Sequence, residues 1–449
     1  MTRRLFPAFL STIVFWLFAC TAIAQEFEKE KAGNWHQWRG PMATGVSESA
    51  KPPLEWDAKK NIQWRIPIEG ESNASPIVWE DRVFVLTAID TGKVDPNLPK
   101  PEDQPERPFG ITFPNTFYEF VVLCLDRKSG KELWREVAAL KIPNEGHHGD
   151  NSFASCSPTT DGKRLYAWFG SAGLFCYDLE GKLLWQKDLG PVSTRRSFGE
   201  GSSPVVHNGR LVIQRDHEGQ SYVICLDAES GDEIWKKERD ELSTWATPLI
   251  VEANGKTQVV TNASNRVRSY DLEDGTLIWE CGGQAGNVTP CPVADDGFVY
   301  CMSGYRGSAA YAIPLDAEGD ISGSKDVAWS LNRGTPYVPS PVLVNGLLYF
   351  NQSNNAILSA VDAKTGDVVI ERTRMDGIKN VYASPVAASG RVYFVGRDGT
   401  TLVIEQGREY KVLAVNELGE DVDASPALAR NQIFIRGKKH LYAIAEQAE

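Results

Sequence analysis

The chain has 449 residues, of which 42% are hydrophobic and 24% charged, so it can form a large core and is not generally disordered. Its 47 Lys+Arg against 59 Asp+Glu give a net charge of −12, which excludes nucleic-acid binding as a main role because phosphate backbones would repel it. Thirteen Trp and 39 Gly are typical of β-rich repeat proteins.

Residues 1–24 predict a secretory signal peptide. Arg3 and Arg4 are followed by an apolar stretch, and the small residues around Ala24 predict cleavage between Ala24 and Gln25. We therefore expect a periplasmic or secreted protein. No later segment has 18 uninterrupted apolar residues, so no transmembrane span is expected in the mature chain.

Two other interpretations of the leader remain open. Residues 17–20 resemble a lipobox, which would place a lipid anchor at Cys20, although Phe18 is large for that pattern. Residues 2–6 resemble a twin-arginine signal, but the strongly apolar stretch that follows favours the general export route.

Residues 25–55 show no repeat and predict an irregular N-terminal segment. Its Trp35 and Trp38, together with Trp56, suggest that this tail packs on the body of the protein. Residues 56–449 form the repeat region. It contains one clear insertion, at 90–116, which holds six prolines and eight charges and predicts a surface excursion in the first repeat.

The repeat is marked by eight prolines, most of them preceded by Ser or Thr and followed by a short apolar run. We refer to the residues before these prolines as the pre-proline residues: Ser75, Ser157, Ser203, Thr247, Cys291, Ser340, Ser384 and Ser425. Each begins two strand-like runs joined by a turn, such as the Asn208-Gly209 hairpin.

A second pattern follows in most units: an Asp, a turn with Gly, and a strand that ends in Trp. It runs from Asp126 to Trp134, from Asp178 to Trp185, from Asp227 to Trp235 and from Asp271 to Trp279. Together the two patterns predict four short antiparallel strands in about 44 residues, which is a propeller blade.

The sequence also predicts how the ring closes. After the last proline there is room for three strands, whereas residues 61–66, with Trp64, predict a strand without preceding partners. This N-terminal strand should complete the last blade and remove its open edge. The predicted fold is therefore an all-β, eight-bladed propeller with four-stranded antiparallel blades.

The Asp–Gly–Trp pattern resembles the pyrroloquinoline-quinone (PQQ) repeat. The resemblance implies that Trp64, Trp134, Trp185, Trp235 and Trp279 dock between blades. The opening Trp35–Pro41 is similar to that of exported PQQ-like proteins, which also resemble the propeller lipoprotein of the outer-membrane barrel-assembly machinery. Quinoprotein dehydrogenases of this family use PQQ with Ca²⁺, a catalytic Asp and often a disulfide between adjacent cysteines. No Cys-Cys pair occurs here, and their Asp and Ca²⁺ ligands map onto no residue of this chain.

Seven cysteines remain if Cys20 is removed with the leader. Three of them, Cys124, Cys176 and Cys225, occupy one repeat position in different blades and are expected to be small apolar core residues. A two-residue turn between Cys291 and Cys301 should place these two on opposite faces, so no disulfide is predicted.

Two long connections carry the densest polar groups. They contain the candidate ligand-binding residues His147, His148, Asp150, Asn151, Arg195, Arg196 and Glu200, with Trp245 nearby as an apolar wall. In a propeller these connections and the 90–116 insertion share one face, so we expect a binding site at the channel mouth. The His-rich loop could instead be a metal site, but it lacks an evident third ligand.

The leading functional hypothesis is a non-enzymatic binding or scaffolding propeller that binds a protein, peptide or glycan in the cell envelope. We expect it to be monomeric. The first alternative is a PQQ- or metal-dependent oxidoreductase of the quinoprotein dehydrogenase type. The second is an outer-membrane assembly lipoprotein. No catalytic residue can be named, because the sequence contains no nucleophile elbow, phosphate-binding loop or dinucleotide fingerprint.

Overall fold

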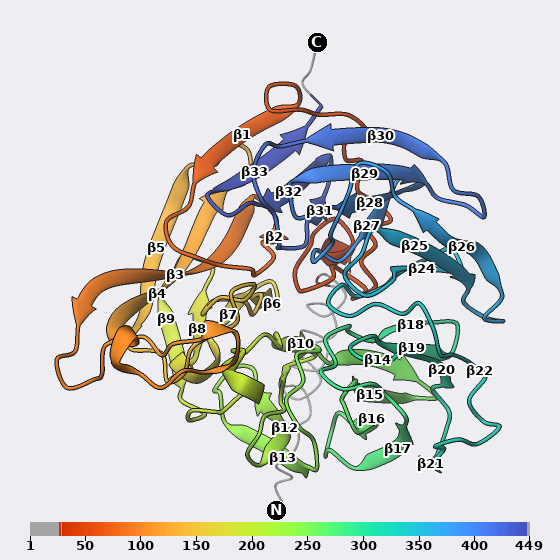
Figure 1. Cartoon of the computed structure of the whole chain (residues 1–449), viewed down its shortest axis with the longest axis horizontal. Helices are drawn as coiled ribbons and strands as arrows, with labels where there is room; N and C mark the ends of the chain where they lie inside the picture. The colour runs from red at the N-terminus through yellow and green to blue at the C-terminus, as the bar shows by residue number, and fades with distance from the viewer. Residues whose placement is uncertain (1–26, 28, 447–449) are drawn as a thin grey trace, which may run out of the picture.

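The structure, a computed structural model, describes residues 27 and 29–446. The predicted leader, its Ala24–Gln25 cleavage site and Cys20 lie outside these residues. Within the described part, eight sheets are arranged in a ring around a central channel, as Figure 1 shows. The eight-bladed propeller predicted from the repeat is confirmed.

The blades follow one another in chain order. The first two contain β2 (Ile77–Trp79), β3 (Arg82–Val94), β4 (Thr116–Asp126) and β5 (Glu132–Lys141), then β6 (Thr159–Thr160), β7 (Arg164–Trp168), β8 (Leu174–Asp178) and β9 (Leu183–Lys187). The third and fourth contain β10 (Val205–His207), β11 (Arg210–Arg215), β12 (Ser221–Asp227) and β13 (Glu233–Arg239), then β14 (Leu249–Ala253), β15 (Lys256–Thr261), β16 (Arg266–Asp271) and β17 (Leu277–Gly282).

The second half of the ring repeats this plan. The fifth and sixth blades contain β18 (Val293–Asp295), β19 (Phe298–Ser303), β20 (Ala309–Pro314) and β22 (Trp329–Leu331), then β23 (Val342–Val344), β24 (Leu347–Asn351), β25 (Ile357–Asp362) and β26 (Val368–Arg374). The last two contain β27 (Val386–Ala388), β28 (Arg391–Val395), β29 (Thr400–Glu405) and β30 (Val412–Glu417), then β31 (Ala427–Ala429), β32 (Gln432–Arg436), β33 (His440–Ala445) and β1 (Ile62–Pro67).

The eighth blade is built from both ends of the described chain. Strand β1 pairs antiparallel with β33, with Trp64 opposite Ala443 and Pro67 opposite His440. In Figure 1 the red β1 lies beside the blue β33. The predicted closure by the N-terminal strand is confirmed, and it removes the edge that three strands alone would leave open.

Two elements depart from the regular blade. The fourth sheet gains a fifth strand, β21 (Gly319–Asp320), which lies in the β20–β22 connection and pairs parallel with β17. The insertion begins later than predicted, because β3 and β4 stay paired as far as Val94 and Thr116. Its irregular part is residues 95–115, with two short 3₁₀ turns, η1 (Pro101–Asp103) and η2 (Pro108–Gly110).

The blades stack through the tryptophans and glycines of the repeat. The Trp64 ring lies 2.7 Å from the place that a side chain on Gly130 would occupy, and its Nε1–H donates to the Arg127 carbonyl at 2.9 Å. A side chain at Gly130 would therefore collide with the neighbouring blade. The contact recurs for Trp134 on Gly181, Trp185 on Gly231, Trp235 on Gly275 and Trp329 on Gly366.

The fourth-to-fifth contact differs from the others. Trp279 is fully buried, but its Nε1–H donates to Gln258 of its own blade, and Gln258 in turn donates to the Leu315 carbonyl of the next blade. The connection that contains β21 replaces the usual Asp–Gly turn in the fifth blade. Trp279 therefore does not pack on a glycine of the next blade as the other tryptophans do. Trp329 docks like the others, although the sequence pattern did not identify it.

Residues 34–56 form an N-terminal strap across one face of the ring. Trp35 exchanges backbone hydrogen bonds with Val78 of the first blade, Ser47 donates to Ala387 of the seventh, and the Trp56 N–H donates to the Asn416 side chain. Trp35 and Trp56 are buried. The strap shares this face with the tight hairpin turns, because it borders a cavity with the turn residue Asn208.

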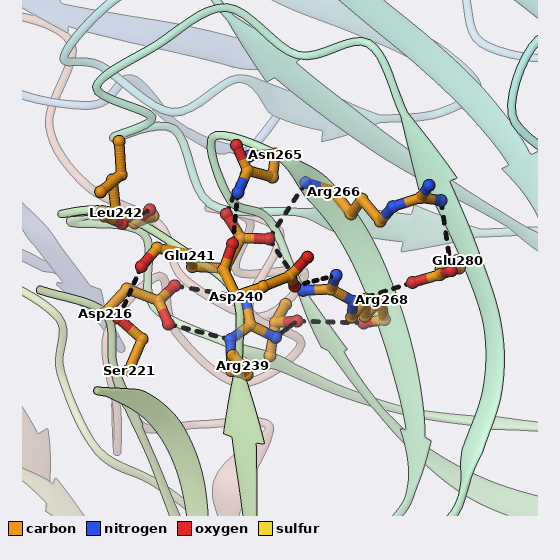
Figure 2. A network of polar contacts seen from close by, with 12 residues as sticks. Asp216, Ser221, Arg239, Asp240, Glu241, Leu242, Asn265, Arg266, Arg268 and Glu280 are labelled. Carbon is orange, nitrogen blue, oxygen red and sulfur yellow. Dashed lines mark hydrogen bonds and ion pairs between the residues drawn. The ribbon is translucent and has the colours of Figure 1, made fainter. Parts of the chain in front are cut away.

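A buried ionic network joins the third and fourth blades (Figure 2). The Arg239 guanidinium donates to both carboxylate oxygens of Asp216, at 2.8 and 3.2 Å, and both side chains are fully buried. Arg268 pairs with the buried Glu241 at 2.9 Å and with Glu280 at 2.9 Å.

No helix among the described residues is long and apolar enough to cross a bilayer.

Candidate functional site

The pre-proline residues lie around the channel, and hydrogen bonds between them join each blade to the next from the first to the eighth. The Ser75 N–H donates to the Ser157 hydroxyl at 2.9 Å, and the Ser157 N–H donates to the Ser203 hydroxyl at 2.9 Å. Five further links of 2.8 to 3.2 Å continue around the ring as far as Ser425. The Ser/Thr preference of the repeat therefore has a physical cause, since seven of the eight side chains accept a hydrogen bond from a neighbouring backbone. Among the described residues, the hydroxyl of the eighth, Ser75, has no such partner.

The strap closes the channel on the hairpin face. Trp38 is half-buried, and its Nε1–H donates to the Cys291 sulfur at 3.1 Å. The next residue, Arg39, is fully buried and donates to the carbonyls of Pro341 and Pro385, both at 2.7 Å. Burial lowers the pKa of Arg39 to about 10. The strap thus turns the channel into a cup with Trp38 at its floor and its mouth toward the opposite face.

The cup has a volume of about 370 Å³, within the usual range of about 300–1,000 Å³ for small-molecule pockets. Seven of the eight pre-proline residues line it, all except Ser75. The residues two positions before the pre-proline residues form a second ring, and all eight of them line the cup. They are Asn73, Ser155, Gly201, Trp245, Thr289, Val338, Tyr382 and Asp423. The first ring is uniform, whereas the second varies from blade to blade.

Aromatic side chains form one side of the wall. Phe109 comes from the insertion and packs on His148 and on Phe198, with ring centres 5.4 and 5.3 Å apart. Phe198 also lies 6.4 Å from Trp245. Tyr305, from the β19–β20 loop of the fifth blade, and Tyr337, from the connection between the fifth and sixth blades, lie 4.9 Å apart. The insertion and the long connections therefore meet at the mouth of the cup.

A polar cluster forms the other side of the wall. Asp150 accepts hydrogen bonds from the Tyr382 hydroxyl and from Arg397, both at 2.8 Å. Burial opposes ionisation of Asp150, but these partners hold its pKa below the ordinary value. Arg397 also binds Asp423 at 2.7 Å, and Lys438 binds Asp423 at 2.9 Å. Both carboxylates at the cup wall are therefore already neutralised by cations.

Four of the eight candidate ligand-binding residues line the cup: His148, Asp150, Asn151 and Trp245. His147 lies behind the wall, against Phe153, with ring centres 4.5 Å apart. Glu200 accepts hydrogen bonds from Ser171 and pairs with Arg215, so it stabilises the loop rather than facing the cup. Arg195 and Arg196 begin the 3₁₀ turn η4 (Arg195–Ser197), beside the mouth.

The two long connections are tied together behind the wall. Glu145 is buried and accepts hydrogen bonds from the backbone N–H and the hydroxyl of Thr194, and burial raises its pKa to about 7. The third 3₁₀ turn, η3 (Gly170–Ala172), borders the same region. These contacts fix the loops that carry His148 and Phe198.

The structure shows no preformed metal centre in its described part. No group of three or more His, Cys, Asp or Glu side chains is placed to hold a metal ion there. The hypothesis of a metal site in the His147–Ser152 loop lacks the further ligands that it needs. His148 packs between two phenylalanine rings, and the only acidic side chain near its ring is that of Asp150, at 3.5 Å. The seven cysteines of the described chain are free and buried.

Comparison with known proteins identifies the family. A family model described as "Outer membrane protein assembly factor BamB" matches residues 119–369 and 219–448. No curated protein matches the chain. Among solved structures, quinohemoprotein alcohol dehydrogenase from Comamonas testosteroni is similar, with a TM-score of 0.63 and 11% identity over 96% of this chain and 84% of that one.

Two further structures share the fold. Quinohemoprotein alcohol dehydrogenase ADHIIG from Pseudomonas putida HK5 has a TM-score of 0.58 and 11% identity, over 95% of this chain and 82% of the other. BamB from Moraxella catarrhalis has a TM-score of 0.52 and 12% identity, over 73% and 93%. At these identities the structures establish the fold alone. The chain belongs to the PQQ-repeat propeller family whose model is described as outer membrane protein assembly factor BamB.

Proposed function

We propose that this chain is a non-enzymatic binding propeller of the cell envelope that takes up its ligand in the cup. The observation that carries the proposal is the cup itself, which is closed below by Trp38 and lined on one side by aromatic rings. Pockets of this kind, mostly apolar with a few placed polar groups, are typical of ligand sites. The ligand is a glycan or an exposed part of a peptide or protein.

The alternative, a PQQ-dependent oxidoreductase, fits the cup only in part. Trp38 offers a flat ring at the floor, as a planar cofactor would require. A Ca²⁺ ion needs several oxygen ligands, usually with carboxylates among them. The two carboxylates that line the cup, Asp150 and Asp423, are both paired with Arg397. The residues present therefore do not fit the cofactor together with its calcium ion.

The second alternative, an assembly lipoprotein, draws support from the family model and from the shared fold with BamB. It also requires a lipid on Cys20. The mass of the mature N-terminus distinguishes this form from one that begins at Gln25. Binding in the cup is compatible with either N-terminus, so the two questions are independent.

The proposal is tested by titrating the purified protein with a panel of soluble oligosaccharides and peptides, following tryptophan fluorescence. We expect binding that is lost in Tyr305→Ala/Tyr337→Ala and kept in Phe117→Ala. Phe117 is a matched control, because it is a half-buried ring on β4 outside the cup lining. Absence of cup-dependent binding, together with dye reduction after loading with PQQ and Ca²⁺, would overturn the proposal in favour of an oxidoreductase.

A further inference from the structure

Three arginines surround the mouth of the cup. The Arg196 guanidinium lies 5.9 Å from the centre of the Phe109 ring, and that of Arg306 lies 5.3 Å from the centre of the Tyr305 ring. Arg195 reaches across to Gly286, with Nη1 4.0 Å from the place that a side chain there would start. Gly286 forms a β-bridge with Tyr305. All three guanidinium groups therefore adjoin the aromatic side of the wall.

These arginines have no acidic partner among the described residues, since none of them forms an ion pair. Glu218, the acid beside the Arg195 loop, accepts hydrogen bonds from the N–H and hydroxyl of Ser243 instead. The chain as a whole carries a net charge of −12. An unpaired basic rim on an acidic protein supplies charged donors that are free to bind an anion from outside.

The wall below the rim suits a sugar better than a peptide. Its second ring contains neutral amide and hydroxyl groups, such as Asn73, Ser155 and Thr289, next to the aromatic rings. Each already donates a hydrogen bond within the wall, which fixes its orientation and leaves acceptor capacity on the hydroxyl oxygens for a sugar. The innermost strands of the blades contain only two to five residues, too short an edge for strand addition. Seven of the eight backbone N–H groups at the pre-proline positions are already used between blades, so they are not free for a peptide backbone.

We propose that the cup binds an anionic oligosaccharide, with sugar rings stacked on its aromatic wall and carboxylate or sulfate groups held by Arg195, Arg196 and Arg306. This inference rests on the proposed function, because it assumes that the cup is the binding site. Carboxylate and sulfate present the same acceptor chemistry to a guanidinium. Affinity should fall with rising salt, since two of the three arginines, Arg196 and Arg306, are exposed to solvent.

The test compares tetragalacturonate, a sulfated galactose tetramer and neutral galactotetraose by calorimetry. We expect at least one charged probe to bind about tenfold or more tightly than the neutral one, because charge-assisted hydrogen bonds are the stronger ones. The variant Arg195→Gln/Arg196→Gln/Arg306→Gln should lose that preference. The matched control Lys59→Gln/Arg65→Gln/Arg430→Gln removes the same charge at exposed positions outside the cup lining and should retain it.

The possible failures are distinguishable. Equal binding of charged and neutral sugars, or tighter binding of tetraglutamate than of either charged sugar, would overturn the anionic-sugar proposal. Both results would leave the cup as the binding site, provided that Tyr305→Ala/Tyr337→Ala abolishes the binding. Binding that survives the tyrosine variant would overturn the cup itself, and with it the proposed function. The two charged probes separate carboxylate from sulfate as the source of the charge.

Discussion

Two ionic clusters of this propeller use the same residue types in opposite settings. Asp216 and Arg239 are fully buried between the third and fourth blades, whereas Asp150 and Arg397 are each about 30% exposed at the cup wall. The first cluster also contacts Thr261 and Tyr270 and has no access to a ligand. A buried pair whose hydrogen bonds are satisfied holds blades together, while an open pair leaves its surface available for binding.

The largest expected effect comes from breaking the buried pair. Asp216→Ala should lower the free energy of unfolding by about 3–5 kcal/mol, because Arg239 would remain buried without its counter-ion. Urea unfolding at neutral pH measures this change. Asp216→Leu/Arg239→Met, which removes both charges, should recover much of the loss. A cost below about 1 kcal/mol for the single variant would contradict the assignment of this cluster to blade cohesion.

An intermediate effect is expected from Glu145, which is buried and forms no ion pair with any residue that the structure describes. In the folded state the Glu145 carboxyl has a pKa of about 7, whereas in the unfolded state its pKa is near 4.5. The folded state therefore binds more protons between these values, and stability should fall as pH rises through this window.

Glu145→Gln should remove this contribution. Relative to the wild type, the variant should gain on the order of 1–2 kcal/mol in unfolding free energy between pH 4.5 and pH 7.5. Chemical denaturation of both proteins at the two pH values measures the difference, in which the titration of other groups cancels. A stability difference that is the same at both pH values would show that Glu145 is ionised in the folded state.

The smallest effect is expected at the open cluster. Asp150→Asn should change the free energy of unfolding by no more than about 1 kcal/mol, because solvent screens its pair with Arg397, in which both side chains are about 30% exposed. Thermal unfolding, measured alongside the Asp216 variants, checks this value. A loss as large as that of Asp216→Ala would erase the distinction between the two clusters.

The fold was predictable because each repeat encodes its own local geometry. The glycine of the Asp–Gly–Trp pattern marks the place where the neighbouring tryptophan packs, so spacing alone located most blade contacts. Trp329 was missed because the β20–β22 connection, with β21 inside it, interrupts the spacing. The role of the pre-proline residues was also missed, since a hydrogen bond between blades leaves no local signal beyond the Ser/Thr preference.

The candidate site was predicted only in part. The sector was identifiable from long polar connections, but charge density favoured His147 and Glu200, which the structure places behind the wall. A better signal was present, because the residues two positions before each pre-proline residue, such as Trp245 and Tyr382, all line the cup. Trp38 could not be placed from sequence, since its position depends on the strap crossing the ring.

Closure of the eighth blade has a consequence for the order of folding. Strand β1 and the strap find their partners mainly in the sixth to eighth blades, more than 270 residues further along the chain. Contacts between such distant segments form slowly, because the loop between them must be ordered first. During synthesis, β1 therefore has no partner until β33 has been made, and the ring closes only in the last step of folding.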